Sequence, residues 1–271
     1  MTRKPHYSKG ITMRATITAV LAIILCNMLF AQTNEPGGAE RILQAKAIIQ
    51  RGVNAANQDL FATAENLLRQ AQHDSRFSAL GNYYLGYVAY RRAVVLQQVD
   101  KDRAVAYLDT AVSRLEEAIS GDNTFAEAYA LLSSCYGLKI SFSPIKGIIL
   151  GPQSSAALKK AKKLAPMNPR VALVSAISIY NTPALFGGSK DKGLEELKRG
   201  VELFDQWRIV DSLQPDWGKD EVWGWIGIAH MDRKETIQAK RAFDRALEIN
   251  PDNGWVKNVL LPKLAAQAEA K

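Results

Sequence analysis

The best candidate for a functional motif is Gly187-Gly188-Ser189-Lys190, which is similar in composition to a phosphate-binding loop. That motif requires G-x-x-x-x-G-K-[ST] between a strand and a helix. Here the order of serine and lysine is reversed, and no strand pattern precedes the glycines. The two glycines instead predict a sharp turn, with Ser189 capping a helix that begins near Lys190. We expect no phosphate site at this turn.

Histidine and cysteine are too sparse to build a metal or nucleophile site. The chain has three histidines and two cysteines, without zinc-like spacing. No H-E-x-x-H, G-x-S-x-G or Cys/His pairing occurs, so no catalytic mechanism can be assembled. Cys135 is expected to be a small buried apolar side chain, and His230 is better explained by packing than by metal ligation. The sequence therefore indicates no enzyme, no cofactor and no metal.

The strongest pattern is an ungapped 34-residue unit from Asp220 to Asn253. It combines small residues, which suit a close helix approach, with large residues that fill the remaining space: Trp223, Ile226, Gly227, Ala239, Phe243 and Ala246. Pro251 ends the second helix because proline lacks an N–H and clashes with the preceding turn. The unit predicts a helix–turn–helix hairpin. One hairpin cannot bury its apolar faces alone, so several copies must stack.

Weaker copies of this residue spacing precede the unit. Their second helices carry small and leucine positions at similar spacing: Ala64, Leu68 and Ala71; Ala111, Leu115 and Ala118; Ser154, Leu158 and Ala161; Gly193, Leu197 and Gly200. Their first helices carry Gly52, Gly86, Ser133 and Ala176. Five units result, at 45–78, 79–125, 126–168, 169–205 and 220–253. They follow an N-terminal linker, or the start of the first helix, at 32–44 and precede a capping helix at 254–271. The predicted fold class is an all-α solenoid.

These residues make the chain resemble the tetratricopeptide repeat (TPR) family over nearly all of its length after the leader. The resemblance implies a superhelix that binds a protein or peptide on the first helices of its repeats. The implied groove is apolar and rich in tyrosine: Ile49, Val53, Tyr83, Tyr87, Tyr90, Leu173, Ile177, Tyr180 and Ile228. Chaperone-binding repeats hold a carboxylate with Lys and Asn where this chain has Ile49 and Val53, so that clamp is absent.

Insertions distinguish this chain from a regular array. About thirteen extra residues near 91–103 have a helix-forming composition and are expected to lengthen both helices of the second unit. Residues 140–153 and 181–189 are expected to be loops, serving either as lids on their own repeats or as exposed binding surfaces. All five tryptophans lie between Trp207 and Trp255. We expect them to hold the linker before the fifth unit in place, with an aromatic binding surface as the alternative.

The first 31 residues have the layout of a secretory signal peptide. Four basic residues and no acid lie within Met1–Arg14, and a nearly continuous apolar run follows from Ala15 to Phe30. The apolar run is short for a membrane span, which normally takes ~20 residues, so cleavage after Ala31 is expected. An uncleaved membrane anchor is the alternative. The start codon could be Met1 or Met13. We expect an exported, periplasmic location to follow from this leader.

Loss of the leader changes the charge balance. The whole chain carries +8, and the leader holds four of its 35 basic residues and none of its 27 acids, which leaves +4. A nucleic-acid partner would require a single basic stripe, whereas these charges are mixed along amphipathic helices. Nucleic acid is therefore discounted.

Two functions remain open from the sequence. The favoured one is an exported scaffold that binds a protein or peptide in its concave surface. The alternative is an accessory or ligand-binding subunit of an envelope solute transporter, in a membrane-associated complex. It rests on a likeness of Phe186-Gly187-Gly188 through Gly193 to exported repeat proteins that accompany transporters.

Overall fold

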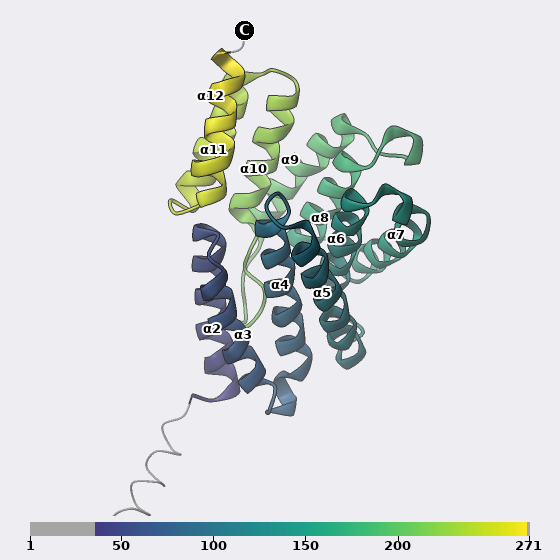
Figure 1. The fold of residues 1–271 in the computed structure, drawn as a ribbon, viewed down its shortest axis with the longest axis vertical. Coiled ribbons are helices and arrows are strands. Elements are labelled where there is room, and N and C mark those ends of the chain that lie inside the picture. Colours follow the sequence, from purple (N-terminus) through teal and green to yellow (C-terminus); the bar gives the residue numbers. More distant parts are fainter. Residues whose placement is uncertain (1–35, 270–271) are drawn as a thin grey trace, which may run out of the picture. The chain divides into compact units, whose positions relative to one another are not determined.

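A computed structural model describes residues 36–269 of the chain (Figure 1). The expected signal peptide at 1–31 lies outside these described residues. From Gly38 onward the chain forms one compact unit. Within residues 36–269 the regular structure is helical throughout and contains no strand. The all-α prediction is confirmed.

Five antiparallel hairpins follow one another along the chain. Their paired helices are α2 (Gly38–Ala55) with α3 (Gln58–Ala71), α4 (Ser78–Leu96) with α5 (Lys101–Gly121), α6 (Ala126–Phe142) with α7 (Gly147–Leu164), α8 (Pro169–Asn181) with α9 (Lys190–Gln206), and α10 (Lys219–Asp232) with α11 (Thr236–Ile249). Short 3-10 turns η1 (Ser75–Phe77), η2 (Pro144–Lys146) and η3 (Ala184–Phe186) occur in the connections. The first helices α2, α4, α6 and α8 contact one another in series, and α10 packs on α9. This arrangement is the predicted solenoid of helical hairpins.

Small residues set the distance between the two helices of a hairpin. A Cβ on Gly227 would lie 2.2 Å from the Phe243 ring, and one on Gly86 would lie 2.7 Å from Leu115 Cγ. In the third hairpin, Ser133 takes the glycine position and its hydroxyl lies 2.9 Å from the Ser154 hydroxyl. The serine is tolerated in the interface because a hydrogen bond satisfies its polar atom.

The chain ends in a π-helical turn, η4 (Val256–Leu260), and α12 (Leu261–Glu269). These elements complete a second apolar cluster with the fifth hairpin, around Phe243, Val256 and Leu260. The end of this hairpin also meets the first one, because Asn250 Nδ2 donates to Asn54 Oδ1 at 2.9 Å. The terminal segment therefore caps the apolar face that the last hairpin would otherwise expose.

The insertions differ from the sequence prediction in one place. The lengthened second hairpin is confirmed, with helices of 19 and 21 residues. The expected loop at 140–153 is wrong, since α6 runs to Phe142, η2 follows, and α7 starts at Gly147 and includes Pro152. Most of residues 140–153 are helical because Phe142 and Leu150 pack against the hydrophobic core.

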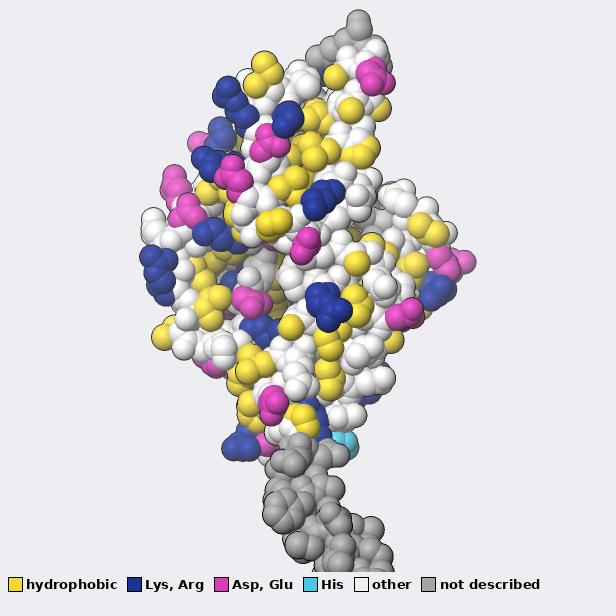
Figure 2. Space-filling view, turned by 90° about the vertical axis from the view of Figure 1, so that its left-hand side faces the viewer, with side chains coloured by type: hydrophobic (Ala, Val, Ile, Leu, Met, Phe, Trp, Pro, Cys, Tyr) yellow, Lys and Arg dark blue, Asp and Glu magenta, His cyan; other side chains and the backbone are white. Residues whose placement is uncertain are grey.

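One face of the molecule, formed by α2, α3, α11 and α12, carries interspersed charges. Figure 2 shows Lys and Arg alternating there with Asp and Glu and with apolar side chains. No single-sign stripe crosses that face. None of the helices within residues 36–269 is long and apolar enough to cross a membrane.

A buried ion pair joins the third hairpin to the fourth. Arg170 on α8 is only 1% exposed and donates to Glu127 on α6 at 3.1 Å. Asn168, the N-cap residue of α8, donates to the same carboxylate oxygen at 2.6 Å. The Arg170 guanidinium also lies 5.2 Å from the centre of the Trp207 ring. This pair therefore connects two repeats and the segment that follows α9.

We expect Glu127→Gln to lower the free energy of unfolding by about 3–5 kcal/mol, because it leaves the Arg170 charge buried without its partner. Urea unfolding followed by circular dichroism measures the change. The matched control is Glu248→Gln, which breaks an exposed pair with Arg245 and should cost less than about 1 kcal/mol. Equal losses in the two variants would contradict a structural role for the buried pair.

Candidate functional site

Part of the predicted groove is covered by the chain's own residues 207–218, which connect α9 to α10 and are called here the crossing segment. In Figure 1 this segment runs as non-helical chain past α4. Its end is fixed by Trp217, whose indole Nε1 donates to the Tyr83 hydroxyl at 2.8 Å. Its middle is fixed by the Tyr84 hydroxyl, which donates to the Leu213 carbonyl at 2.7 Å.

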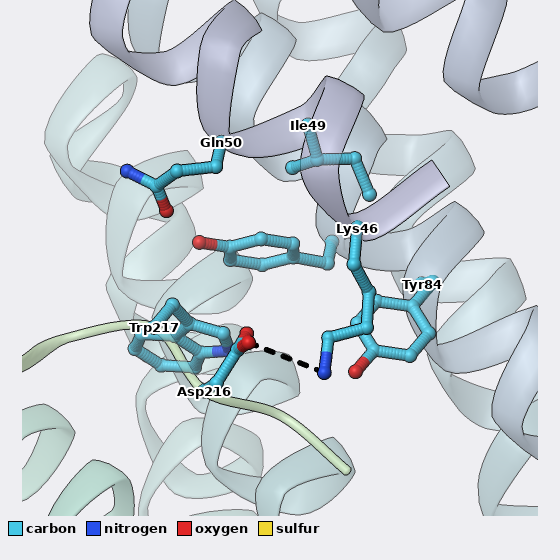
Figure 3. Close-up of a pocket in the computed structure, with 7 residues that line it drawn as sticks. Lys46, Ile49, Gln50, Tyr84, Asp216 and Trp217 are labelled. Carbon is cyan, nitrogen blue, oxygen red and sulfur yellow. Dashed lines mark ion pairs between the residues drawn. The ribbon is translucent and has the colours of Figure 1, made fainter. Parts of the chain in front are cut away.

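Lys46 on α2 holds the crossing segment from the other side. Its ammonium donates to the backbone carbonyls of Ser212 and Gln214, the latter at 2.6 Å. It also pairs with the Asp216 carboxylate at 3.3 Å, as Figure 3 shows. The Lys46 side chain is nearly buried, so these three acceptors replace the water that its charge loses.

Aromatic rings form the floor under Trp217. The Tyr87 ring stacks on it with centroids 5.3 Å apart, and the Tyr83 ring lies parallel to Tyr87 at 6.5 Å. The Arg91 guanidinium lies 4.9 Å from the Tyr87 centroid and pairs with Glu221 on α10. We define the cradle as Lys46, Ile49, Tyr83, Tyr84 and Tyr87. It is a surface that contacts a turn at residues 211–214, in which Gln214 N donates to the Asp211 carbonyl, together with one indole and one carboxylate.

Little space remains between the cradle and the crossing segment. The hollow lined by Lys46, Ile49, Gln50, Tyr84, Tyr87, Asp216 and Trp217 has a volume of about 10 Å³ (Figure 3). That volume is about the room needed for one water molecule. A ligand larger than water can therefore reach the cradle only when the crossing segment leaves it.

The nine predicted groove residues fall into separate groups. Ile49, Tyr83 and Tyr87 lie under the crossing segment, and Leu173 lies 3.1 Å from where a Cβ on Gly218 would stand. Gly218 has φ 107°, a conformation that favours glycine, as the chain turns into α10. The remaining residues lie elsewhere on the first helices or are only half-buried: Val53, Tyr90, Ile177, Tyr180 and Ile228.

Tyr180 belongs to a polar contact between the fourth and fifth hairpins. Its hydroxyl donates to Asp232 Oδ2 at 2.7 Å, and Lys190 pairs with the same carboxylate. Its ring lies 6.4 Å from that of Trp225. Ile228 instead packs in the second apolar cluster. These two predicted groove residues therefore take part in repeat packing.

Sequence reasoning missed Lys46, Tyr84 and Asp216 as groove residues. One available signal was the composition of α4, which carries apolar side chains on all sides and so must be buried on more than one of them. The expectation that tryptophans hold the linker in place is confirmed for Trp207, which stacks with Arg170, and for Trp217. Ser189 caps α9 as expected, accepting from Lys192 N.

Burial raises the pKa of the cradle tyrosines, because a phenolate would lose its hydration there. The pKa of Tyr87 rises to about 12, an effect of burial that the nearby Arg91 charge only partly offsets. The pKa of Tyr83 is raised well above its usual value, also mainly by burial. The neutral phenols are therefore part of the folded state.

We expect folding stability to fall at alkaline pH. A raised pKa in the folded state contributes stability that is complete below the unfolded value of about 10 and is lost as pH rises toward 12. Tyr87→Phe removes one such group and should reduce the slope of stability against pH in that window by up to about 1.4 kcal/mol per unit. Denaturant unfolding at pH 8, 10 and 11 measures this. An unchanged slope in Tyr87→Phe would show that its phenol does not couple to folding.

Comparisons with known proteins agree with this architecture. Residues 220–253 match the tetratricopeptide repeat family model. This is the same 34-residue unit that the sequence pattern predicts, and it forms α10 and α11. No curated protein sequence matches the chain. Within residues 36–269, no three His, Cys, Asp or Glu side chains come together as metal ligands.

Two solved structures are similar in fold. A thermophilic TPR protein from Thermus thermophilus shares 15% identity at a TM-score of 0.53, over 83% of this chain and 98% of that one. The HusA haemophore from Porphyromonas gingivalis shares 23% identity at a TM-score of 0.54, over 69% of this chain and 93% of that one. At these identities the likeness concerns the fold. The chain therefore has a TPR-type helical fold with one sequence-matched repeat.

Proposed function

We propose that the protein is a scaffold that binds a protein partner through a non-helical segment laid on the cradle. The observation that carries this proposal is the crossing segment itself. The cradle holds its backbone through carbonyl acceptors at Ser212, Leu213 and Gln214, and its side chains through Asp216 and Trp217. Tetratricopeptide repeats generally mediate protein interactions, which supports the same class of partner.

The contacts define what a partner segment must offer. A segment that forms a turn and then carries an acidic residue followed by tryptophan would reproduce the Lys46 ion pair, the Tyr83 hydrogen bond and the Tyr87 stack. Such a segment competes with an intramolecular occupant, whose effective concentration reaches the millimolar range for a short tether. Partner binding is therefore coupled to release of the crossing segment.

A peptide with the sequence of residues 208–219 tests the cradle directly. We expect Trp217→Leu/Asp216→Ala, which weakens the internal occupant, to bind this peptide at least tenfold more tightly than the wild type does, measured by fluorescence anisotropy. A tenfold change corresponds to about 1.4 kcal/mol. Trp217→Leu is used because leucine retains more apolar volume than alanine, and Trp217→Ala would cost about 3–5 kcal/mol in packing.

Two controls make this experiment decisive. Adding Lys46→Ala to the opened variant should abolish peptide binding, and a peptide with alanine in place of its tryptophan should bind the opened variant poorly. Circular dichroism verifies that each variant is folded. A folded, opened variant that does not bind the peptide would contradict the cradle as a peptide receptor.

We also propose that this scaffold works outside the cytoplasm, in the periplasm of an envelope. The support is the basic, apolar and polar order of the first residues, which the signal-peptide pattern predicts. Intact mass measurement of the protein from an osmotic-shock fraction should give a chain that begins at Gln32. A chain retained in the cytoplasmic fraction with its full leader would contradict export.

A transporter-associated ligand-binding role receives less support from the described residues. The hollow at the cradle has a volume of about 10 Å³. A solute would have to displace the crossing segment before it could bind there. The cradle contacts backbone carbonyls and an indole of the crossing segment. These contacts suit a polypeptide occupant better than a small solute.

A further inference from the structure

The turn between α6 and α7 presents an apolar surface to solvent. Ile145, Ile148 and Ile149 are 74%, 74% and 68% exposed. Phe142 and Leu150, on either side, are half-buried and pack against the core. The three isoleucines are therefore displayed by an ordered corner of the fold, which we call the isoleucine corner (Ile145, Ile148 and Ile149).

Three lysines and one acidic residue line a hollow beside this corner. The open hollow has a volume of about 320 Å³ and is lined by Lys101, Asp102, Val105, Lys139, Phe142, Ser143 and Lys146. Lys139 pairs with Asp109 at 2.5 Å. Within residues 36–269, neither Lys101 nor Lys146 has a carboxylate partner within ion-pair distance. The hollow therefore offers two cations that can compensate an anion from outside the chain.

The next hairpin repeats this chemistry at the same edge. Connections from a first helix to its second helix lie at one edge of an antiparallel stack, so the α6–α7 and α8–α9 turns share that edge. In the α8–α9 turn, Leu185 and Phe186 are 87% and 75% exposed. The first turn of α9 then carries Lys192 beside the acidic Asp191, and Lys190, which pairs with Asp232. Two successive turns thus combine projecting apolar side chains with lysines.

We infer that this edge docks on an anionic phospholipid membrane surface, with the isoleucine corner among the acyl chains and Lys101 and Lys146 beside headgroup phosphates. Apolar side chains rimmed by lysine bind the interfacial region of bilayers through buried area plus attraction to anionic lipid. Side chains exposed to this degree stand out from the surface and do not line a groove. A protein interface would need a continuous complementary patch of about 800 Å² per partner.

Vesicle sedimentation with the chain from Gln32 tests the proposal. That chain contains the whole compact unit from Gly38 and lacks the apolar leader, which would bind lipid by itself. We expect binding to vesicles of phosphatidylglycerol and phosphatidylethanolamine, and much weaker binding to phosphatidylcholine alone. Ile145→Ser/Ile148→Ser/Ile149→Ser should lower partitioning at least ~tenfold, since it removes the inserted apolar area.

The lysines give an independent readout. Lys101→Gln/Lys146→Gln should lower partitioning by about fivefold per lysine, and 0.5 M salt should reduce wild-type binding in the same direction. The matched controls are Met167→Ser/Val259→Ser and Lys198→Gln/Lys257→Gln, which change exposed residues elsewhere. Both controls should bind like the wild type, and circular dichroism should show all variants folded.

Insertion can also be observed directly with an environment-sensitive fluorophore on Ile148→Cys. Cys135 is buried, so the label reacts at the introduced thiol. A blue shift with anionic vesicles supports docking through this corner. Absence of binding to either vesicle type, or unchanged binding in the triple serine variant, overturns the proposal. So does concentration-dependent self-association that the triple serine variant removes, because it identifies a second copy as the occupant.

Discussion

The hydrogen bond from the Trp217 indole to the Tyr83 hydroxyl holds the crossing segment over part of the first-helix surface of this solenoid. The first helices of a repeat array must bury apolar side chains against their neighbours, yet their inward faces still need a covering. Here α4 brings Tyr83, Tyr84 and Tyr87 to that face, and the crossing segment covers them. Burial of the phenols is tolerated because buried polar groups that find hydrogen-bond partners avoid the cost of lost hydration.

Because the crossing segment covers these tyrosines, they are not an open binding surface. In an open array, the tyrosines would be a free surface for a partner. In this chain they form a cradle with a resident ligand of the same polypeptide. Anchors at both ends hold that ligand, through Arg170 and Trp207 near its start and Tyr83 and Trp217 at its end. The buried pair of Arg170 and Glu127 thus serves repeat stacking and the crossing segment together.

Sequence periodicity was sufficient for the hairpins because their packing is local. Gly86, Ser133 and Gly227 face their own partner helices a few tens of residues away, so small-residue spacing reports that contact. Sequence periodicity did not predict the helical structure of residues 140–153. Proline and glycine there indicate a loop, whereas Phe142 and Leu150 gain enough burial against the core to keep the segment helical around Pro152.

The sequence by itself determined the all-helical class and the five hairpins, because each depends on spacing along one or two helices. Only the tertiary structure decided which residues of the first helices meet solvent and which are covered. The Lys46 contact with Gln214 spans 168 residues, and Trp217 reaches Tyr83 across 134. The crossing segment has no periodic sequence pattern from which its contacts with α2 and α4 could be predicted. Its path is set by two contacts: the Trp217 indole is buried against α4, and Lys46 pairs with Asp216. Both contacts form where the stacked helices leave room for them.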